Sequence, residues 1–367
     1  MPRSRCITSN NACGPGAGRF ESAAYTEACE HWERPAIPPM AGPPGVRQGY
    51  ETTSNLSRMR EEARRISWNN LGRKIIFFLP GMFVQDGLSG KYPAISLTGP
   101  RCDLLCDHCG GKLLEPMISA DDPAALFETC LALEQKGHYG VLISGGCNRD
   151  GCLPWQPFLP AIKAVKEKTR LFISVHAGFI GEKDAVGLKQ AGVDQALVDV
   201  IGDNASLQRI YHVPFGIDRI ISGLEALQKA GLPIVPHIVC GIDYGRMRGE
   251  QKALDIVAHF RVEQVVILSL MSIAGTPAQH VNPPSPEDVA DLMARARLQM
   301  PSTPISLGCA RTRGNSRLEV LAVEAGVNRM ALPSDEAIER AQAYGLDIRY
   351  QASCCSVPEA WAGDRWS

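Results

Sequence analysis

From residue 92 to residue 345, short apolar runs alternate with longer amphipathic stretches, and the cycle repeats about eight times. The apolar runs are continuous rather than interrupted by polar residues, as expected for strands that are buried on both faces of a parallel sheet. This alternation predicts a parallel (β/α) barrel, complete or nearly complete, with an open doubly wound sheet as the alternative. Strands are expected at 74–80, 92–99, 139–146, 171–178, 193–202, 232–243, 263–271, 304–310 and 327–333. Helices are expected at 56–67, 122–137, 158–169, 182–192, 217–231, 249–260, 285–300, 316–326 and 334–345.

Composition divides the chain into three parts. Residues 1–65 contain stretches such as PAIPPMAGPPG, which bury little apolar surface, so we expect a flexible or loosely docked extension there. Residues 66–345 carry the barrel pattern. Residues 346–367 are expected to form a C-terminal tail that contains the adjacent cysteines Cys354 and Cys355.

The charge balance excludes several classes of partner. A net charge of -1 with 45% apolar residues is typical of a soluble globular protein and gives no sign of nucleic-acid or membrane-surface binding. The longest apolar runs are too short to cross a bilayer, and the N-terminal sequence lacks the apolar core of a secretory signal. We therefore expect a cytoplasmic protein. In that reducing compartment its 13 cysteines are better candidates for metal ligands, redox groups or buried side chains than for disulfides.

Three cysteines stand close together directly after the expected strand 92–99. Cys102, Cys106 and Cys109 have the spacing C-x3-C-x2-C within GPRCDLLCDHCGGK. A structural zinc site needs four ligands in two close pairs, and a fully ligated cubane iron–sulfur cluster also needs four cysteines. Three thiols without a neighbouring fourth therefore indicate a metal centre that keeps one coordination position open.

Other chemistry-bearing residues also follow expected strands. SGGCNRDGC follows the strand at 139–146, HAG ends the strand at 171–178, and DVIGDN ends the strand at 193–202. CGIDYGR and GCARTRG end two later strands. Active sites of (β/α) barrels lie at the carboxyl ends of the strands, so these segments are expected to gather at one rim with the cysteine trio.

A strand, then C-x3-C-x2-C, then a second strand that ends in Gly-Gly, resembles the radical S-adenosylmethionine (SAM) superfamily over residues 74–335. This resemblance implies a [4Fe-4S] cluster on Cys102, Cys106 and Cys109, with the fourth iron left for the amino and carboxylate groups of SAM. An electron passed to the sulfonium would release a 5'-deoxyadenosyl radical, and ferredoxin or flavodoxin would supply that electron.

The resemblance also implies residues that contact SAM. Gly145 and Gly146 match the glycine pair that approaches the SAM amino group, and His108 offers a ring near the adenine where many members have an aromatic residue. Asp199 and Asp203 stand where members place polar groups for the ribose hydroxyls. GIDYG, beginning at Gly241, stands at the fifth-strand position that lines the adenine. The acid that usually follows the Gly pair is replaced by Cys147.

The remaining cysteines suggest a second, auxiliary cluster. Its candidate ligands are Cys147, Cys152, Cys309, Cys354 and Cys355. Biotin synthase and lipoyl synthase use such a cluster as their sulfur source, and the overall pattern is most similar to the biotin-synthase-like subunits of the two-component lipoyl synthase. That resemblance implies sulfur insertion into an octanoyl chain held by a carrier protein or domain, with a second radical SAM subunit as partner.

Other interpretations of the same residues remain open. The enzyme could catalyse another radical SAM reaction, such as sulfur insertion into a free small molecule, methylation or methylthiolation. The trio could instead form a zinc site of a non-catalytic protein with a distant fourth ligand. Arg311 and Arg313, after the strand at 304–310, could bind a carboxylate, support a cluster or simply be exposed charges.

Overall fold

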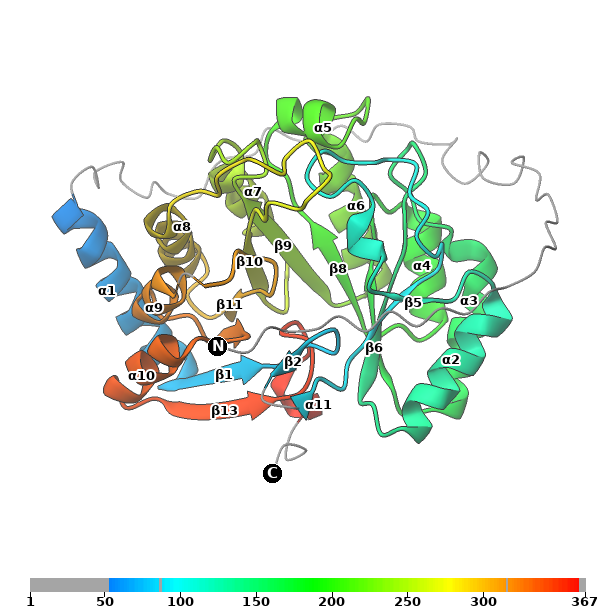
Figure 1. Cartoon of the computed structure of the whole chain (residues 1–367), viewed down its shortest axis with the longest axis horizontal. Helices are drawn as coiled ribbons and strands as arrows, with labels where there is room; N and C mark the ends of the chain where they lie inside the picture. Colours follow the sequence, from blue (N-terminus) through cyan, green and yellow to red (C-terminus); the bar gives the residue numbers. More distant parts are fainter. Residues whose placement is uncertain (1–52, 86–87, 315, 363–367) are drawn as a thin grey trace. The chain divides into compact units, whose positions relative to one another are not determined.

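The computed structural model describes residues 53–85, 88–314 and 316–362. These residues form one eleven-stranded sheet, in the order β13-β1-β12-β11-β10-β9-β8-β7-β6-β4-β5, and a two-stranded hairpin of β2 and β3. Every pairing within the large sheet is parallel. The sheet curls, and helices cover its outer face (Figure 1). The predicted parallel α/β barrel architecture is therefore confirmed, in a form whose edge strands are β5 and β13.

Nine of the strands match the expected positions within a few residues. The strands are β1 (Lys74–Phe78), β2 (Val84–Gln85), β3 (Leu88–Ser89), β4 (Ala94–Ser96), β5 (Ile118–Ser119), β6 (Gly140–Ser144), β7 (Phe172–His176), β8 (Gln195–Asp199), β9 (Ile234–Cys240), β10 (Val265–Ser269), β11 (Ile305–Leu307), β12 (Arg329–Ala331) and β13 (Asp347–Gln351). The helices are α1 (Thr53–Leu71), η2 (Lys112–Leu114), α2 (Pro123–Gln135), α3 (Trp155–Lys168), α4 (Glu182–Gln190), α5 (Asn204–Ile210), α6 (Ile217–Ala230), α7 (Glu250–Val257), α8 (Pro286–Gln299), α9 (Arg317–Glu324), α10 (Asp335–Ala343) and α11 (Glu359–Ala362).

Local sequence explains why the elements begin where they do. The central strands are buried along almost their whole length, as in β10, where every residue is buried. Side chains at the helix starts satisfy free backbone N–H groups: Asp122, Ser285 and Ser334 each accept a hydrogen bond from the amide three residues later. Because each βα unit returns the chain to the same end of the sheet, the loops after the strands meet at one rim.

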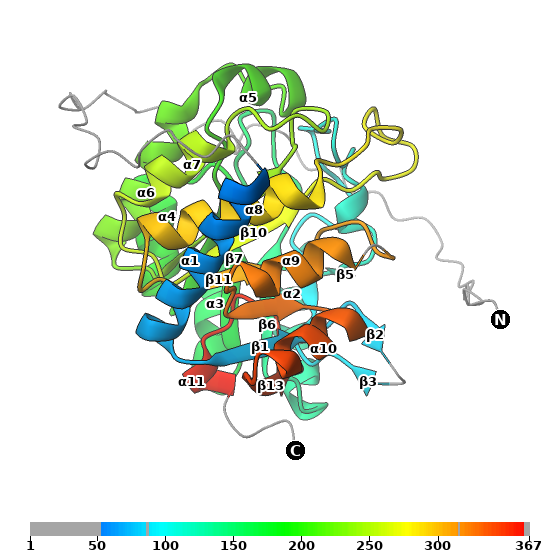
Figure 2. The same ribbon diagram turned by 90° about the vertical axis from the view of Figure 1, so that its left-hand side faces the viewer.

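Helix α1 packs against the barrel rather than extending away from it. Met59 and Ala63 are buried, and Arg60 pairs with Asp291 of α8 at 2.5 Å. Figure 2 shows α1 lying across α8. The helix expected at 56–67 is thus confirmed and is longer than expected, and the predicted domain boundary at residue 65 falls inside it. Residues 1–52, the rest of the predicted extension, lie outside the described residues.

The C-terminal tail adds one edge strand to the sheet and then packs against buried residues of other strands. Its first part is β13, a strand that the sequence analysis did not predict. This strand pairs with β1. Beyond β13, the buried Arg329 of β12 donates to the carbonyl oxygens of Cys355 and Val357. Trp361 contacts the ring of Phe172. The segment is therefore fixed against the amino ends of several strands, which holds Cys355 among the buried residues of the sheet.

Among the described residues, no helix is both long enough and apolar enough to cross a membrane.

Candidate active site

The cysteine loop begins at the carboxyl end of β4 and is closed by its own hydrogen bonds. Thr98 donates from its hydroxyl to the carbonyl of Arg101, and the Gly110 amide donates to the carbonyl of Cys106 at 2.7 Å. Gly110 and Gly111 both have positive φ angles, which glycine adopts without a Cβ clash. These turns fold the loop back on itself, so Cys102, Cys106 and Cys109 lie close together despite their separation along the chain.

The thiols of the trio interact with one another and with Cys147. Cys109 is hydrogen-bonded to Cys106 and to His108, and these bonds lower the pKa of Cys109. The same bond and burial raise the pKa of Cys106, with smaller contributions from Cys102 and Cys147. Within the described residues, no group of three or more Cys, His or carboxylate side chains is arranged so that it could hold a metal ion. The donor set nevertheless fits an iron–sulfur cluster, since thiolates are its usual protein ligands and Cys109 favours the thiolate.

The glycine pair after β6 packs against this loop. The Gly146 amide donates to the Thr98 hydroxyl at 2.6 Å. A Cβ at Gly146 would lie 1.8 Å from the carbonyl oxygen of Arg101 and 2.7 Å from the Cα of Cys102. At Gly145, the nearest atoms to such a Cβ lie at 3.4 Å. Gly146 therefore permits close approach of β6 to the backbone that carries the first cysteine.

Gly146→Ala is expected to displace the cysteine loop, because the Arg101 backbone cannot yield to the new methyl group. We expect reductive SAM cleavage to fall by about 10- to 100-fold, the range found when a residue that orients metal ligands is lost. Gly181→Ala is the control and is expected to retain cleavage within about threefold, because a Cβ at Gly181 would meet no atom within 4 Å. The measurement is 5'-deoxyadenosine formation by the reconstituted protein. Equal activities of the two variants would contradict this reading.

A small cavity lies between the carboxyl ends of β8 and β9. Asp199, Tyr211, His237 and Asp243 are among its lining residues. Tyr211 also contacts the His108 ring, with centroids 5.2 Å apart. The cavity is therefore joined to the cysteine loop through an aromatic contact.

A histidine–carboxylate pair sets the charge at this cavity. Asp199 Oδ1 lies 3.6 Å from His176 Nε2. Burial alone would raise the pKa of Asp199, but the neighbouring His176 outweighs it and lowers the pKa to about 2. Burial and the neighbouring His176 lower the pKa of His237 to about 4. At neutral pH the cavity thus presents an ionised carboxylate beside a neutral imidazole.

Two of the expected SAM contacts have structural roles in this chain. Asp203 is the N-cap of α5, and its carboxylate accepts hydrogen bonds from the Ser206 amide and hydroxyl at 2.9 and 2.7 Å. Gly241 has a φ of 73°, and a Cβ there would lie 2.5 Å from Pro284. Asp203 and Gly241 are not among the residues that line the cavity, whereas their neighbours Gly202 and Ile242 are. A SAM contact by either residue stays a prediction.

The other candidate cysteines form two groups. Cys147 lies near the trio. Its pKa is raised first by burial and then by the charges of Cys102 and Cys152. The thiol of Cys152 lies near the Phe179 carbonyl at 3.5 Å and the Arg219 guanidinium at 3.9 Å.

The second group is Cys309 with Cys354 and Cys355. Burial and then the nearby Cys354 raise the pKa of Cys309 to about 11. A hydrogen bond from Cys355 lowers the pKa of Cys354 to about 6 despite burial, and Cys354 Sγ lies 3.0 Å from the Ser356 hydroxyl. Cys355 packs with apolar residues of β1, β8, β9 and β10. Cys309 packs against the same cluster, so the C-terminal tail and the segment after β11 meet there.

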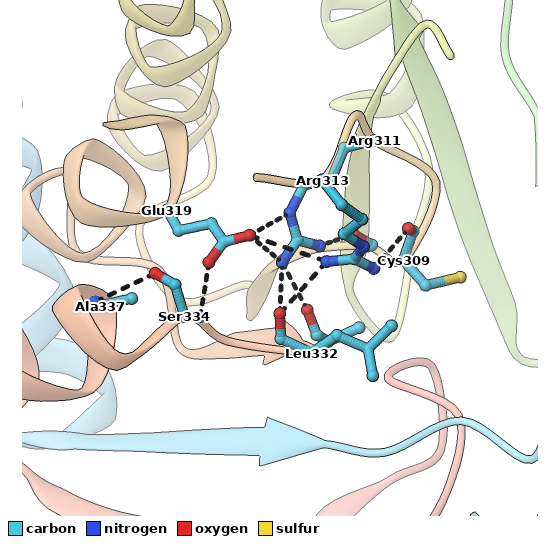
Figure 3. A network of polar contacts seen from close by, with 9 residues as sticks. Cys309, Arg311, Arg313, Glu319, Leu332, Ser334 and Ala337 are labelled. Atoms are coloured by element: carbon cyan, nitrogen blue, oxygen red, sulfur yellow. Dashed lines mark hydrogen bonds and ion pairs between the residues drawn. The ribbon is translucent and has the colours of Figure 1, made fainter. Parts of the chain in front are cut away.

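Arginines fix the loop that carries Cys309. Figure 3 shows Arg313 donating to the Cys309 carbonyl and Arg311 donating twice to Glu319 of α9, with the Cys309 thiol pointing away from both guanidinium groups. Arg311 also donates to the carbonyls of Ala331 and Leu332, and it is 2% exposed. Of the interpretations left open for Arg311, the structure contradicts an exposed charge, because Arg311 is buried and its donors are occupied by protein groups.

Sequence reasoning missed two residues of this site. Tyr211 follows α5, a helix of about two turns whose short length leaves little periodicity to detect. Asp243 lies in the GIDYG segment, but its own role was not predicted. Its ion pairs with Arg209 and Arg248 join residues from two different βα units. The Asp203-to-Ser206 spacing of an N-cap is the signal that could have located α5.

Two family models match the chain. One describes the radical SAM superfamily and matches residues 96–245, which include the trio, the glycine pair and the cavity residues Asp199 and Asp243. The other describes the biotin and thiamin synthesis associated domain and matches residues 267–354. The second match ends at Cys354 and includes Cys309.

Curated relatives are biotin synthases. That of Vesicomyosocius okutanii is 25% identical over 172 residues, which are 46% of this chain and 52% of the relative. That of Neorickettsia sennetsu is 30% identical over 41% of this chain and 46% of the relative. That of Chlorobaculum parvum is 22% identical over 66% of this chain and 75% of the relative. The chain thus spans about half the length of the first of these relatives.

Solved structures agree on the fold. Methylornithine synthase has a TM-score of 0.58 at 16% identity, over 81% of this chain and 90% of that one. The [FeFe]-hydrogenase maturase of Carboxydothermus hydrogenoformans has a TM-score of 0.57 at 17% identity, over 81% of this chain and 73% of that one. Residues 96–245, which carry the cysteine loop, the glycine pair and the cavity residues Asp199 and Asp243, therefore resemble the radical SAM superfamily, and residues 267–354 resemble the biotin and thiamin synthesis associated domain.

Proposed function

We propose that this protein is a radical SAM enzyme that inserts sulfur into an unactivated C–H bond, namely of an octanoyl chain on a carrier protein or domain in lipoyl biosynthesis. The observation that carries the proposal is the presence of two separate groups of cysteines at one curled sheet. One group follows β4 beside the cavity, and the other joins β11 to the C-terminal tail.

The first group would hold the [4Fe-4S] cluster. Cys102, Cys106 and Cys109 would be its ligands, and the cavity lined by Asp199 and Tyr211 would receive the nucleoside part of SAM. Cluster and SAM together supply a 5'-deoxyadenosyl radical after a one-electron reduction, for which ferredoxin or flavodoxin is the proposed donor. The ionised Asp199 would accept hydrogen bonds from hydroxyl groups, and the buried surroundings would limit access of water to the reacting carbon.

The second group would hold the auxiliary cluster that donates sulfur. Cys309, Cys354 and Cys355 are favoured over Cys147 and Cys152, because Cys355 belongs to a buried cluster against which Cys309 packs and Cys354 affects the pKa of Cys309, while Cys147 lies beside the first group. The similarity to biotin synthases supports a sulfur-inserting reaction. A second radical SAM subunit is proposed as partner, and a cytoplasmic location is proposed from the sequence.

The test uses anaerobically reconstituted protein, an octanoylated carrier peptide, SAM and a reductant. We expect about eight irons per chain, the sum of two four-iron clusters, and a peptide heavier by the mass of one sulfur atom or two. Cys309→Ser is expected to reduce the iron content to about four per chain and sulfur transfer by at least about 100-fold, while 5'-deoxyadenosine formation stays within about threefold.

Cys152→Ser is the matched control, since it removes one partly buried thiol outside the second group, and it is expected to retain sulfur transfer. The reverse result for these two variants would assign the auxiliary cluster to Cys147 and Cys152. About four irons with methylated or otherwise altered product would instead indicate another radical SAM reaction. Colourless protein with stoichiometric zinc would refute the enzyme proposal.

A further inference from the structure

Asp107 lies between Cys106 and Cys109, and each of its polar groups has a hydrogen-bond partner. Its carboxylate accepts a hydrogen bond from the Tyr244 hydroxyl at 2.5 Å through Oδ2, and Oδ1 lies 2.9 Å from His212 Nε2. Its backbone amide donates to the Ile210 carbonyl at 2.9 Å, and its carbonyl accepts from the Ala278 amide at 3.2 Å. The Asp107 side chain is 14% exposed.

These partners come from three different units of the barrel. Ile210 and His212 lie at the end of α5, after β8; Tyr244 lies between β9 and α7; and Ala278 lies between β10 and α8. In Figure 1 these loops gather with the cysteine loop at the same end of the sheet. One residue of the cysteine loop is therefore fixed to three consecutive loops of the rim.

Backbone strain is concentrated at this contact. In the described part of the chain, only four residues other than glycine have a positive φ: Leu105, His212, Tyr244 and Leu332. Leu105 belongs to the cysteine loop, and His212 and Tyr244 are the two side-chain partners of Asp107. A positive φ is unfavourable for such side chains and persists only where surrounding contacts enforce it. Unfavourable backbone conformations therefore occur both in the cysteine loop, at Leu105, and at the two side-chain partners of Asp107.

The partners of Asp107 are direct neighbours of cavity residues. His212 follows Tyr211, and Tyr244 follows Asp243, both of which line the cavity. On the cysteine loop, Asp107 lies between Cys106 and His108. We propose that Asp107 is a positioning residue that fixes the distance between the cysteine trio and the cavity, so that one SAM molecule can reach the open iron and the cavity together. This inference rests on the proposed radical SAM function.

The proposal predicts that loosening the contact weakens SAM binding more than it slows chemistry. Asp107→Asn keeps the shape of the side chain but replaces one acceptor oxygen by a donor, and Tyr244→Phe removes only the hydroxyl. In both variants we expect the iron content to stay at the wild-type level, because all three thiols remain. The KM for SAM is expected to rise about tenfold, while kcat for 5'-deoxyadenosine formation changes by less than about threefold.

Asp103→Asn is the matched control. It makes the same chemical change in the same loop, but Asp103 is exposed, so its KM for SAM is expected to stay at the wild-type value. The double variant Asp107→Asn/Tyr244→Phe is expected to raise the KM by less than the product of the two single effects, because both changes break one contact. A multiplicative double variant, or an unchanged KM in both single variants, would overturn the proposal.

A second measurement does not require a loaded cluster. Hydrogen exchange of the metal-free protein reports local opening of the 102–110 loop. We expect faster exchange there in Asp107→Asn and Tyr244→Phe than in wild type or Asp103→Asn. A wild-type protein that binds no SAM would refute the proposed function, whereas unchanged loop exchange in both variants would refute the contact's positioning role alone.

Discussion

Cys106→Ala is expected to abolish reductive cleavage of SAM, with a loss of at least about 10³-fold, equivalent to about 4 kcal/mol of transition-state stabilisation. Cys106 is the central thiol of the trio, is 5% exposed and is hydrogen-bonded to Cys109. Without it only two thiolates of the trio remain, and two ligands cannot hold three irons of a cubane cluster in place. Iron content at the first group is therefore expected to fall together with activity.

Cys130→Ala is the control for loss of a buried thiol. Cys130 is completely buried in α2, away from both cysteine groups, and behaves as a small apolar side chain. We expect a loss of about 1 kcal/mol in stability, as for a modest cavity, with SAM cleavage close to wild type. Activity and iron retained both in Cys106→Ala and in the double variant Cys106→Ala/Cys147→Ala would contradict the assignment of the trio.

A nearby thiol could replace the missing ligand in that experiment. Cys147 lies close enough to the trio for the charge of Cys102 to raise its pKa. The double variant Cys106→Ala/Cys147→Ala therefore completes the test: if Cys147 substitutes for Cys106, residual iron and activity in the single variant disappear in the double variant.

The parts of the candidate site that the sequence could indicate are those encoded locally. The spacing of Cys102, Cys106 and Cys109 lies within a single loop, and the Gly145–Gly146 pair directly follows an apolar run that forms β6. The strand positions followed from continuous burial, since a run of adjacent apolar residues suits a strand covered on both faces. These features depend on neighbours along the chain and could therefore be predicted.

The parts that sequence did not locate depend on contacts between distant segments. Asp107 meets His212 and Tyr244, which lie 105 and 137 positions away, and nothing in its own loop indicates either partner. The C-terminal tail lacks an apolar run, yet β13 forms because β1 offers it a free edge. That pairing fixes where the tail that carries Cys354 and Cys355 returns to the sheet, which the sequence did not predict.

Residue type also left the role of some charged groups undecided. Arg311 and Arg313 lie two positions apart in one loop, but Arg311 is 2% exposed and enclosed by carbonyls, whereas the side chain of Arg313 is 38% exposed. Burial decides between a structural and an exposed guanidinium, and burial at a loop depends on how the following helix packs. Glu319 lies on that helix, α9, where it meets Arg311.

Arg311→Met is expected to destabilise the protein by about 3–5 kcal/mol, the cost of leaving one partner of a buried ion pair uncompensated. Glu319 is 5% exposed, and its carboxylate also accepts a hydrogen bond from the Ser334 amide at the start of α10. Removing Arg311 also leaves the carbonyls of Ala331 and Leu332 without this donor. Urea unfolding of the metal-free protein measures the effect, because it separates folding from cluster binding.

Arg317→Met is the matched control, because Arg317 pairs with Glu287 at 2.9 Å on the surface, where both side chains are about half exposed. Such a pair contributes about 0–1 kcal/mol, so a small change is expected. Arg311→Met/Glu319→Met removes both buried charges and is expected to be less destabilised than Arg311→Met alone. If Arg311→Met lowers the free energy of unfolding by no more than Arg317→Met does, the network of Figure 3 does not hold the Cys309 loop in place. The position of Cys309 in the second cysteine group would then not depend on this network.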